Sequence, residues 1–359
     1  MTDKIKVGII GCGGIANGKH LPSLSQIEEV QLVAFCDVIE ERAVKAAKKF
    51  GAENAKVYKN YKSLLEEDID VIHVCTPNES HCEITVASLQ SGKHVMCEKP
   101  MAKTTEEAKQ MIEAQKESGK KLTIGYQNRF RKDSLHAYKL AKDNEFGEIY
   151  NAKAHAIRRR AVPTWGVFLD EEAQGGGPLI DIGTHALDLT LWLMDNYEPE
   201  FVVGKAYHKL SSTKNAANAW GPWDTDKFTV EDSAFGFVTM KNGATIYLES
   251  SWALNSLEVG EAQTTLHGTK AGLSLRDKMI VNGEEHGLLY DKEVQMETGG
   301  VDFYDEAGDD EALTEAEQWI NCIKNDEEPL VKPGQALIVT QILEAIYESS
   351  KQNKPVYIN

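Results

Sequence analysis

Short apolar runs alternate with helical stretches over the first third of the chain. Residues 41–51 and 105–119 carry helix formers at helical period, and each stretch ends in a glycine. Five runs rich in Val and Ile flank them: IKVGIIG (5–11), VQLVAFCD (30–37), IDVIHVCT (69–76), KHVMCE (93–98) and KLTIGY (121–126). Such runs are typical of strands covered on both faces. The alternation predicts an α/β fold over residues 1–126, with a doubly wound parallel sheet.

The pattern changes after Tyr126. SAFGFVTM (233–240) and ATIYLESSW (244–252) alternate apolar and polar residues, and the Lys-Asn-Gly between them predicts a tight hairpin turn. Residues 334–352 predict a late helix that packs back towards the first domain. We therefore expect residues 127–359 to form an α+β domain in which helices cover one face of an open, mostly antiparallel sheet.

Charge restricts the class of ligand. Two domains suit a chain of 359 residues, which contains 56 acidic and 39 basic residues and has a net charge of −17. This surplus repels nucleic acid and anionic membranes, so neither is an expected partner. A small neutral or cationic molecule fits better. The acidic patch at 302–317 is most simply a solvated surface.

Cysteine usage and hydropathy indicate a cytoplasmic protein. The six cysteines form no CxxC pair, and several lie in apolar runs, as buried reduced thiols do. The N-terminus lacks the apolar core of a secretion signal, and no apolar run approaches the roughly 20 residues that span a bilayer.

A glycine-rich loop follows the first predicted strand. VGIIGCGGIA (7–16) has a G-x-G-x-x-A pattern between a strand and a helix. There, Gly11 allows the turn, Gly13 lets a pyrophosphate approach, and Ala16 lets the helix pack on the strand. The helix N-terminus attracts phosphates. The alternative is a turn without a ligand. The expected cofactor contacts in this loop are Gly11, Gly13, Gly14 and Ile15.

Asp37 ends the second predicted strand, 21 residues after Ala16. A carboxylate there accepts hydrogen bonds from a ribose 2′-hydroxyl and repels a 2′-phosphate. The expected cofactor is therefore NAD and not NADP.

VMCEKPMAK (95–103) places a lysine before a proline where an apolar run stops. Pro100 constrains Lys99 to extended geometry, so the lysine stays at the carboxyl end of the strand, which faces the ligand crevice in such sheets. CTPNESH (75–81) ends the preceding strand in the same way. The alternative to a role for Lys99 in the site is that it is a solvated charge at the end of the strand, with Pro100 as the first residue of a helix. The expected cofactor contacts at this edge are Thr76, Asn78, His81, Glu98 and Lys99.

GGGPLIDIGTHALDLTLWLM (175–194) places Asp181, His185 and Asp188 on one helical face. Histidine can take a hydroxyl proton near neutrality, and a carboxylate can orient it. Hydride transfer from a secondary alcohol needs such a base, and a protonated Lys99 would stabilise the developing alkoxide. Two alternatives remain: the three residues bind a divalent metal, or His185 is an ordinary core histidine.

HAIRRRAVPTWG (155–166) contains three consecutive arginines followed by Trp165. A charge run is commonly a solvated face. Alternatively, the arginines bind sugar hydroxyls or a phosphate while Trp165 packs on a pyranose ring. Because strand side chains alternate, Arg158 and Arg160 share a face that Arg159 does not.

Taken together, the glycine loop, TPNESH, GKHVMCEKPMA and GGGPLIDIGTHALD resemble the glucose-fructose oxidoreductase, inositol dehydrogenase and rhizopine catabolism (Gfo/Idh/MocA) family. The similarity continues through VEDSAFGFVTMKNGATIYLESSW and LHGTKAGLSL to PVYI near the end. The Glu-Lys-Pro and Asp-x-Gly-x-His motifs are specific, whereas the glycine loop alone is not.

The resemblance implies a Rossmann domain, a second domain whose open sheet often forms the interface of a homo-oligomer, and no resident metal. It assigns Lys99, Asp181 and His185 as catalytic residues that also bind substrate, and Pro100 as the residue after a cis peptide bond. YQNRFR (126–131) matches the entry into the second domain, with Asn128 near the cofactor. Together with Arg158, Arg160 and Trp165, these residues form the expected substrate site.

The resulting hypothesis is an NAD-dependent dehydrogenase that reversibly oxidises a secondary ring hydroxyl of a sugar, glycoside or cyclitol. The RRRAVPTWGVF segment resembles members that act on pyranosides and favours C3 oxidation of a glucoside to a 3-keto-glucoside. The alternatives are an inositol dehydrogenase, a catalytically silent NAD-binding regulator, and a metal-assisted lyase or hydrolase. Assembly as a dimer or tetramer is expected.

Overall fold

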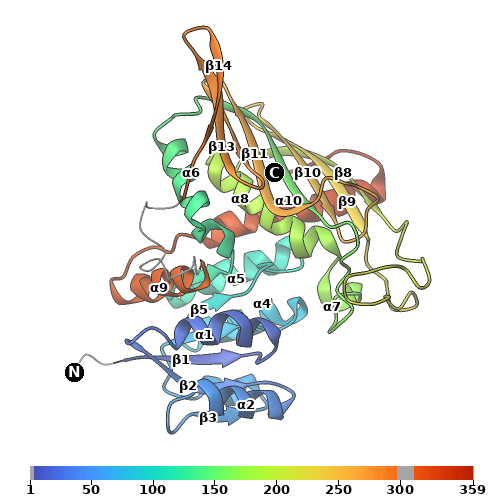
Figure 1. Ribbon diagram of the computed structural model, residues 1–359. Helices are drawn as coiled ribbons and strands as arrows, with labels where there is room; N and C mark the ends of the chain where they lie inside the picture. Colours follow the sequence, from blue (N-terminus) through green and yellow to red (C-terminus); the bar gives the residue numbers. More distant parts are fainter. Residues whose placement is uncertain (1–3, 297–310, 359) are drawn as a thin grey trace. The chain divides into compact units, whose positions relative to one another are not determined.

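A computed structural model of the chain describes residues 4–296 and 311–358 (Figure 1). The chain divides into two compact units: unit 1 comprises Met1–Gln127 and Asp310–Leu337, and unit 2 comprises Asn128–Asp309 and Ile338–Asn359. The first break lies next to the predicted boundary at 126. The predicted second domain, however, ran without interruption to 359, whereas the structure groups residues 310–337 with unit 1.

Unit 1 is built on a parallel sheet. In the described residues its strand order is β3-β2-β1-β4-β5-β6, and every neighbouring pair is parallel. The chain adds β2 and β3 on one side of β1 and then adds β4, β5 and β6 on the other side, so the strand order switches between β1 and β4. The strands are β1 Ile5–Ile10, β2 Val30–Cys36, β3 Lys56–Tyr58, β4 Val71–Val74, β5 His94–Cys97 and β6 Leu122–Ile124. The five predicted strands and the parallel sheet are confirmed. Strand β3 was missed because three residues carry no clear apolar pattern.

Helices cover the sheet of unit 1. They are η1 Ala16–His20, α1 Leu21–Leu24, α2 Glu40–Phe50, α3 Tyr61–Leu65, η2 Asn78–Ser80, α4 His81–Gln90, α5 Thr105–Ser118 and α9 Glu311–Lys324. Gly119 ends α5 in the left-handed conformation, with φ of +65°, as expected of a C-cap glycine. Gly51, which follows α2, has instead an extended backbone.

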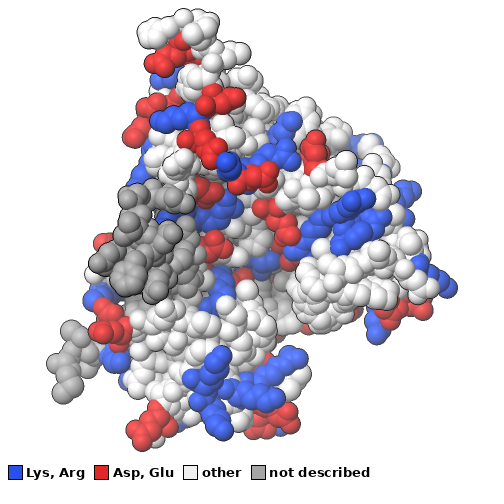
Figure 2. Space-filling view, viewed as in Figure 1, with Lys and Arg blue, Asp and Glu red and all other residues white. Residues whose placement is uncertain are grey.

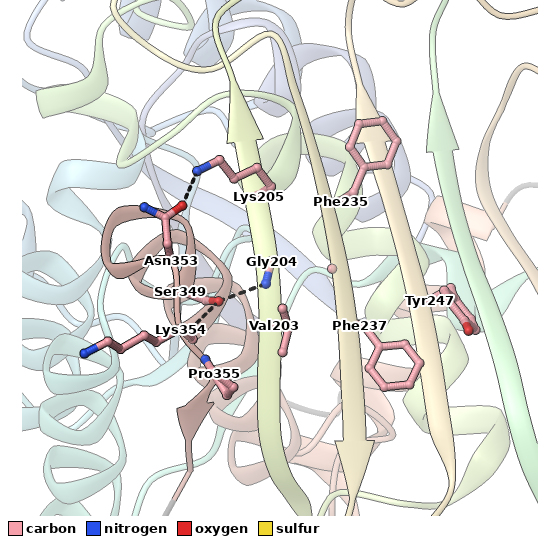
Figure 3. Close-up of a pocket in the computed structure, with 11 residues that line it drawn as sticks. Val203, Gly204, Lys205, Phe235, Phe237, Tyr247, Ser349, Asn353, Lys354 and Pro355 are labelled. Carbon is pink, nitrogen blue, oxygen red and sulfur yellow. Dashed lines mark hydrogen bonds between the residues drawn. The ribbon is translucent and has the colours of Figure 1, made fainter.

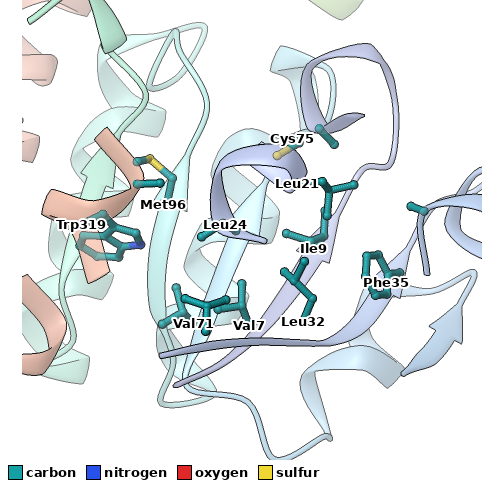
Figure 4. Packing of buried hydrophobic residues seen from close by; sticks show 14 of the residues in the cluster. Val7, Ile9, Leu21, Leu24, Leu32, Phe35, Val71, Cys75, Met96 and Trp319 are labelled. Atoms are coloured by element: carbon teal, nitrogen blue, oxygen red, sulfur yellow. The ribbon is translucent and has the colours of Figure 1, made fainter. Parts of the chain in front are cut away.

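Helix α9 explains why residues 310–337 group with unit 1. Its Trp319 is 1% exposed and packs in the same cluster as Val7, Leu24 and Met96 (Figure 4). Burying an indole of this size stabilises the fold by an estimated 2–3 kcal/mol, which fixes α9 on the sheet. The predicted acidic surface at 302–317 lies partly outside the described residues. Within α9, Glu315 is buried and not solvated.

Unit 2 contains the second sheet. In the described residues its order is β14-β13-β12-β11-β7-β10-β9-β8-β15, and only β7 and β10 pair in parallel. The strands are β7 Ile149–Ile157, β8 Pro199–Tyr207, β9 Ser233–Met240, β10 Thr245–Ser251, β11 Gly260–Gly268, β12 Ala271–Leu275, β13 Met279–Glu285, β14 Leu288–Glu293 and β15 Val356–Tyr357. The predicted open, mostly antiparallel sheet is confirmed.

Helices pack on one face of this sheet. The helices are η3 Gln127–Phe130, α6 Lys132–Lys142, α7 Glu171–Gln174, η4 Leu179–Gly183, α8 Thr184–Met194 and α10 Pro333–Gln352, of which α10 was predicted at 334–352. Ile346 of α10 lies so close to Gly204 and Gly236 that an added Cβ would approach it within 2.6 Å and 2.5 Å. On the opposite face of the same strands, Val203, Phe237 and Tyr247 line a shallow hollow (Figure 3).

The predicted hairpin joins β9 to β10. Only Gly243 of its turn adopts a positive φ, +88°, whereas the prediction assigned positive φ to Asn242 as well. Alternation is confirmed: Val238, Ile246 and Leu248 are buried on the helix-covered face.

The structure shows how the charged residues are distributed on one face and where the cysteines lie. Acidic and basic side chains are interspersed over the face in view in Figure 2. All six cysteines fall within the described residues, and each is a buried free thiol. In the portions of the chain that the structure describes, no helix combines the length and apolar character needed to cross a membrane.

Candidate active site

The glycine loop follows β1 as predicted. Gly11 has a φ of +90°, and a Cβ on it would lie 2.5 Å from the carbonyl oxygen of Cys75, so only glycine fits. Gly13 and Gly14 face open space, because a Cβ on either would meet no atom within 4 Å. Ala16 is fully buried in the core of unit 1, which lets the helix approach the sheet. Ile15 is 40% exposed beside them.

Asp37 is held at the end of β2 by backbone donors. Its Oδ2 accepts from the Cys12 amide at 2.9 Å and its Oδ1 accepts from the Ile39 amide at 2.8 Å. The carboxylate therefore has a fixed orientation next to the glycine loop. An open, Cβ-free loop beside an oriented carboxylate fits the pyrophosphate and ribose of NAD. Gly11, Gly13, Gly14, Ile15 and Asp37 are the residues of the loop region that would hold it.

Lys99 lies at the carboxyl end of β5, and the Lys99–Pro100 peptide bond is cis. The Lys99 amide donates to Glu98 Oε2 at 3.1 Å. Thr76 and Asn78 follow β4, which neighbours β5 in the sheet, and Ser80 Oγ donates to Thr76 Oγ1 at 2.8 Å. Because β4 and β5 are parallel neighbours, their carboxyl ends lie side by side, and so do the segments that carry Thr76, Asn78 and Lys99.

The Glu98 side chain is buried within unit 1. Lys19 Nζ donates to its Oε1 at 2.8 Å, and His20 Nε2 lies 2.8 Å from the same oxygen. Burial acts to raise the pKa of Glu98, but Lys19 and His20 outweigh it and hold the pKa well below its usual range. Lys19 also pairs with Glu315 of α9 at 2.8 Å. The Glu98 carboxylate is therefore the centre of a buried ionic network, and its expected cofactor contact stays a prediction.

His81 is also buried, and its ring contacts two backbone carbonyl oxygens. Its ring is 1% exposed, with Nδ1 at 2.8 Å from the Pro100 carbonyl oxygen and Nε2 at 2.9 Å from the Thr76 carbonyl oxygen. Burial lowers its pKa. The imidazole thus joins the segments that follow β4 and β5, and its expected cofactor contact stays a prediction.

Asp181 and His185 lie in unit 2, on η4 and at the start of α8. Asp181 Oδ2 accepts a hydrogen bond from Trp252 Nε1 at 3.1 Å. The Asp181 carboxylate also attracts the Arg158 guanidinium and helps to raise the pKa of that arginine, together with Glu261. Two glycines of the preceding GGG run allow the helix to pack closely: a Cβ on Gly176 would lie 2.0 Å from Tyr347 Oη, and one on Gly177 would lie 2.3 Å from a backbone oxygen.

Asp188 does not belong to this group. Arg129, which is fully buried, donates to it through Nε at 2.8 Å and Nη2 at 2.5 Å. Burial raises the pKa of Asp188 even beside this cation. The described residues contain no group of three or more His, Cys, Asp or Glu side chains arranged to hold a metal ion. The Asp181, His185 and Asp188 set of the metal hypothesis is therefore not brought together.

Asn128 contacts the candidate base directly. Its side-chain amide lies 3.0 Å from His185 Nδ1. When the amide nitrogen faces the ring, Nδ1 accepts and the neutral imidazole carries its proton on Nε2. When the carbonyl oxygen faces it, Nδ1 carries the proton and Nε2 can act as the base. Asn128 was expected near the cofactor; the structure places it against His185.

Glu231 anchors the segment that carries Asp181. Its carboxylate accepts from the Gly177 amide at 2.8 Å, the Leu179 amide at 3.1 Å and Tyr347 Oη at 2.9 Å. Burial raises its pKa, against the three donors that favour the carboxylate. Sequence reasoning missed Glu231 because its partners are distant in the chain. The VEDSAF context gave no local signal beyond a charge at a strand start.

The arginine run is engaged by neighbouring residues. Arg158 donates to both oxygens of Glu261, at 2.6 Å and 2.7 Å, and Arg160 Nη2 donates to Asn255 Oδ1 at 2.7 Å. Trp165 is 51% exposed. The predicted substrate residues Arg158 and Trp165 share a further neighbour, Trp220, which the sequence reasoning did not identify.

A Rossmann sheet with this open glycine loop, joined to a unit that carries Asp181 on η4 and His185 on the adjoining α8, is typical of a dinucleotide-dependent oxidoreductase. Residues 5–126 match the oxidoreductase family with the NAD-binding Rossmann fold, and residues 139–358 match the C-terminal alpha/beta domain of that family. The chain belongs to the Gfo/Idh/MocA family and is an NAD-dependent dehydrogenase.

Several relatives support this membership. The chain is 35% identical to the D-glucoside 3-dehydrogenase of Escherichia coli (strain K12), over 98% of this chain and 96% of that protein. It is 30% identical to the inositol 2-dehydrogenase of Salmonella paratyphi B, over 53% of this chain and 55% of that protein. The solved complex of a levoglucosan dehydrogenase with NADH and levoglucosan shares the fold, with a TM-score of 0.84, 21% identity, and coverage of 99% of this chain and 100% of that one.

Proposed function

We propose that the protein reversibly oxidises the C3 hydroxyl of a D-glucoside and gives a 3-keto-glucoside. The observation that carries this proposal is the 35% identity, along almost the whole of both chains, to a D-glucoside 3-dehydrogenase. The chain also retains Lys99, Asp181 and His185, the residue types that such a reaction requires.

Each residue has a separate role in this proposal. His185 accepts the hydroxyl proton at Nε2 in the tautomer with its own proton on Nδ1, which Asn128 stabilises when its side-chain carbonyl oxygen, in place of the amide nitrogen, faces that atom. The Lys99 ammonium stabilises the negative charge that develops on the same oxygen. Asp181, fixed by Trp252, favours the cationic form of the site after proton transfer. NAD, when bound, supplies a nicotinamide C4 that accepts the hydride from the carbinol carbon, so two electrons leave the sugar and one proton is released.

A second candidate is oxidation of an inositol. It is favoured by the 30% identity to an inositol 2-dehydrogenase, which covers about half of each chain. Because a cyclitol lacks an anomeric substituent, substrates with and without one distinguish the two candidates.

The deciding experiment follows NADH absorbance with purified protein, NAD, and either a methyl or phenyl glucoside, glucose, or an inositol. We expect turnover with glucosides and a product that carries a ketone at C3 by NMR. Turnover only with inositols would replace the glucoside by a cyclitol. Absence of turnover with all of them, despite NADH binding, would support the silent NAD-binding regulator.

A variant pair tests the proposed role of Lys99. Lys99→Ala should lower kcat on the substrate identified above by about 100-fold or more, with an NADH dissociation constant that changes little. Lys116→Ala, an exposed position on α5, is the matched control. An unchanged kcat for Lys99→Ala would remove the lysine from the reaction.

We also propose that the protein forms a homo-oligomer through the outer face of the nine-stranded sheet, and that it is cytoplasmic. Val203 and Tyr247 expose large apolar surfaces there, 41% and 49% respectively. Exposed apolar surface of this kind supports association. The six buried free thiols support a reducing compartment.

A further inference from the structure

Two tryptophans of unit 2 form an exposed aromatic pair. Trp165 is 51% exposed and Trp220 is 45% exposed, and their rings meet edge to face with centroids 4.8 Å apart and an interplanar angle of 84°. Indole rings bury large apolar areas when a partner is available, so two half-exposed rings in contact mark a binding surface.

The loops that carry these rings are tied together. Asn218 Oδ1 accepts from the Val162 amide at 2.8 Å, and Asn218 Nδ2 donates to the Val162 carbonyl at 3.0 Å. Thr164 Oγ1 donates to the Trp220 carbonyl at 3.1 Å. The pair is therefore held in place before any ligand arrives, which lowers the entropy lost on binding.

Ring contacts connect the pair to the candidate catalytic residues of unit 2. Trp165 lies 5.9 Å from Phe168, and Phe168 lies 6.3 Å from Trp252, measured between ring centroids. Trp252 in turn donates to Asp181. The exposed pair is thus connected through Phe168 to the indole that fixes Asp181.

The charges around the pair favour a neutral ligand. Arg158 stacks over Trp220 at 5.6 Å, but its guanidinium is held by both oxygens of Glu261. Arg160 is held by the Arg159 carbonyl and Asn255. These ties reduce the attraction for a phosphate. The electron-rich faces of the indoles suit instead a ring with polarised C–H groups or an aromatic ring.

We propose that Trp165 and Trp220 form a stacking subsite for the second ring of a glucoside, the aglycone or a second pyranose, while the oxidised glucose ring lies nearer Asp181. This inference rests on the proposed glucoside oxidation. It identifies the substrates as glucosides with a second ring and assigns the specificity to Trp220 and Trp165. An aryl aglycone and a second pyranose share a six-membered ring with a face that can stack on an indole.

The test compares kcat/KM for phenyl β-glucoside, cellobiose and methyl β-glucoside. The wild type should prefer a two-ring substrate, and Trp220→Ala should lower the ratio of two-ring to methyl glucoside by about tenfold, mainly through KM. Trp220→Tyr should restore most of the ratio. Leu289→Ala, at a highly exposed apolar position on β14, is the control and should leave the ratio unchanged. The two-ring substrate, phenyl β-glucoside or cellobiose, whose kcat/KM falls further in Trp220→Ala shows whether the subsite prefers an aryl ring or a sugar ring.

An equal loss on all three substrates, or no loss on the two-ring substrates, would overturn the subsite. If the wild type oxidises no glucoside, the proposed function fails, and binding decides the subsite separately. Calorimetric titration of phenyl β-glucoside and cellobiose into wild type and Trp220→Ala, with NADH present, then shows either binding that the variant loses, which upholds the subsite, or none, which refutes it.

Discussion

At the scale of single residues, the contact between Asn128 and His185 governs which ring nitrogen can take a proton. Asn128→Asp places a carboxylate 3.0 Å from Nδ1, where it stabilises the imidazolium. The pKa of His185 should rise, so the acid limb of the kcat/KM profile should move to higher pH by about one unit. Asn54→Asp, an exposed substitution in unit 1, should leave the profile in place. An unshifted limb in Asn128→Asp would show that His185 does not titrate in the reaction.

Asp37 makes a second prediction at this scale. Its carboxylate is oriented by the amides of Cys12 and Ile39, and its charge should repel a 2′-phosphate. Asp37→Asn keeps one acceptor oxygen and removes the charge, so the preference for NADH over NADPH should fall about tenfold or more. Fluorescence titration of both reduced cofactors measures this ratio. Glu40→Gln, near the start of α2, is the control, and equal ratios in wild type and Asp37→Asn would contradict the assigned role of Asp37.

At the scale of elements, Lys19 joins three parts of unit 1. Its ammonium contacts Glu98 after β5 and Glu315 on α9, and all three side chains are at most 9% exposed. Lys19→Met leaves both carboxylates buried without their cation, which should cost about 3–5 kcal/mol of unfolding free energy. Urea denaturation of the full chain measures the loss, and Lys45→Met, exposed on α2, should change stability by less than about 0.5 kcal/mol.

The pH dependence of this loss follows from the pKa directions. In the wild type the pKa of Glu98 is depressed, so its contribution to stability is present above the unfolded pKa, near 4.5, and disappears as pH falls through the lower folded value. In Lys19→Met both carboxylates lose this cation, while Glu98 keeps His20 as a partner. The folded pKa of each should rise relative to the wild type, and that of Glu315, which burial already raises, should rise further. The variant therefore gains stability as pH falls towards 4.5. The difference from wild type should be larger at pH 8 than at pH 5, and a constant difference would contradict the ionic origin of the network.

Sequence periodicity predicted most elements but not their long-range partners. Five of the six described strands of unit 1 were predictable because each lies in a mostly apolar run, and the hairpin at Gly243 because its strands alternate. Helix α9 was not, since its first turns are acidic and its buried Glu315 has a partner nearly 300 residues away in Lys19. The candidate site followed the same rule. Local motifs located Lys99, Asp181 and His185, whereas Asn128 against His185 and the Trp220 pair depend on contacts that no local pattern encodes.

At the scale of the whole molecule, the open sheet of unit 2 is the surface expected to join copies of the chain. Its inner face is covered by α8 and α10, while Phe235, Phe237 and Tyr247 lie on the other face, with Lys205 beside them tied to Asn353 at 2.7 Å (Figure 3). A net charge of −17 opposes association in general, so the exposed apolar side chains of this face are where two copies are expected to approach.

Sedimentation velocity at low micromolar concentration tests this interface. The wild type should sediment as a dimer or tetramer, and Tyr247→Glu should dissociate it by at least tenfold in the dissociation constant, because the new carboxylate must be desolvated next to its symmetry mate. Val44→Glu adds the same charge at an exposed apolar position of α2 in unit 1 and should retain the wild-type mass. A monomeric wild type would refute assembly. An oligomer that survives Tyr247→Glu but dissociates in Val44→Glu would move the interface to unit 1, because both variants add one negative charge at a half-exposed position.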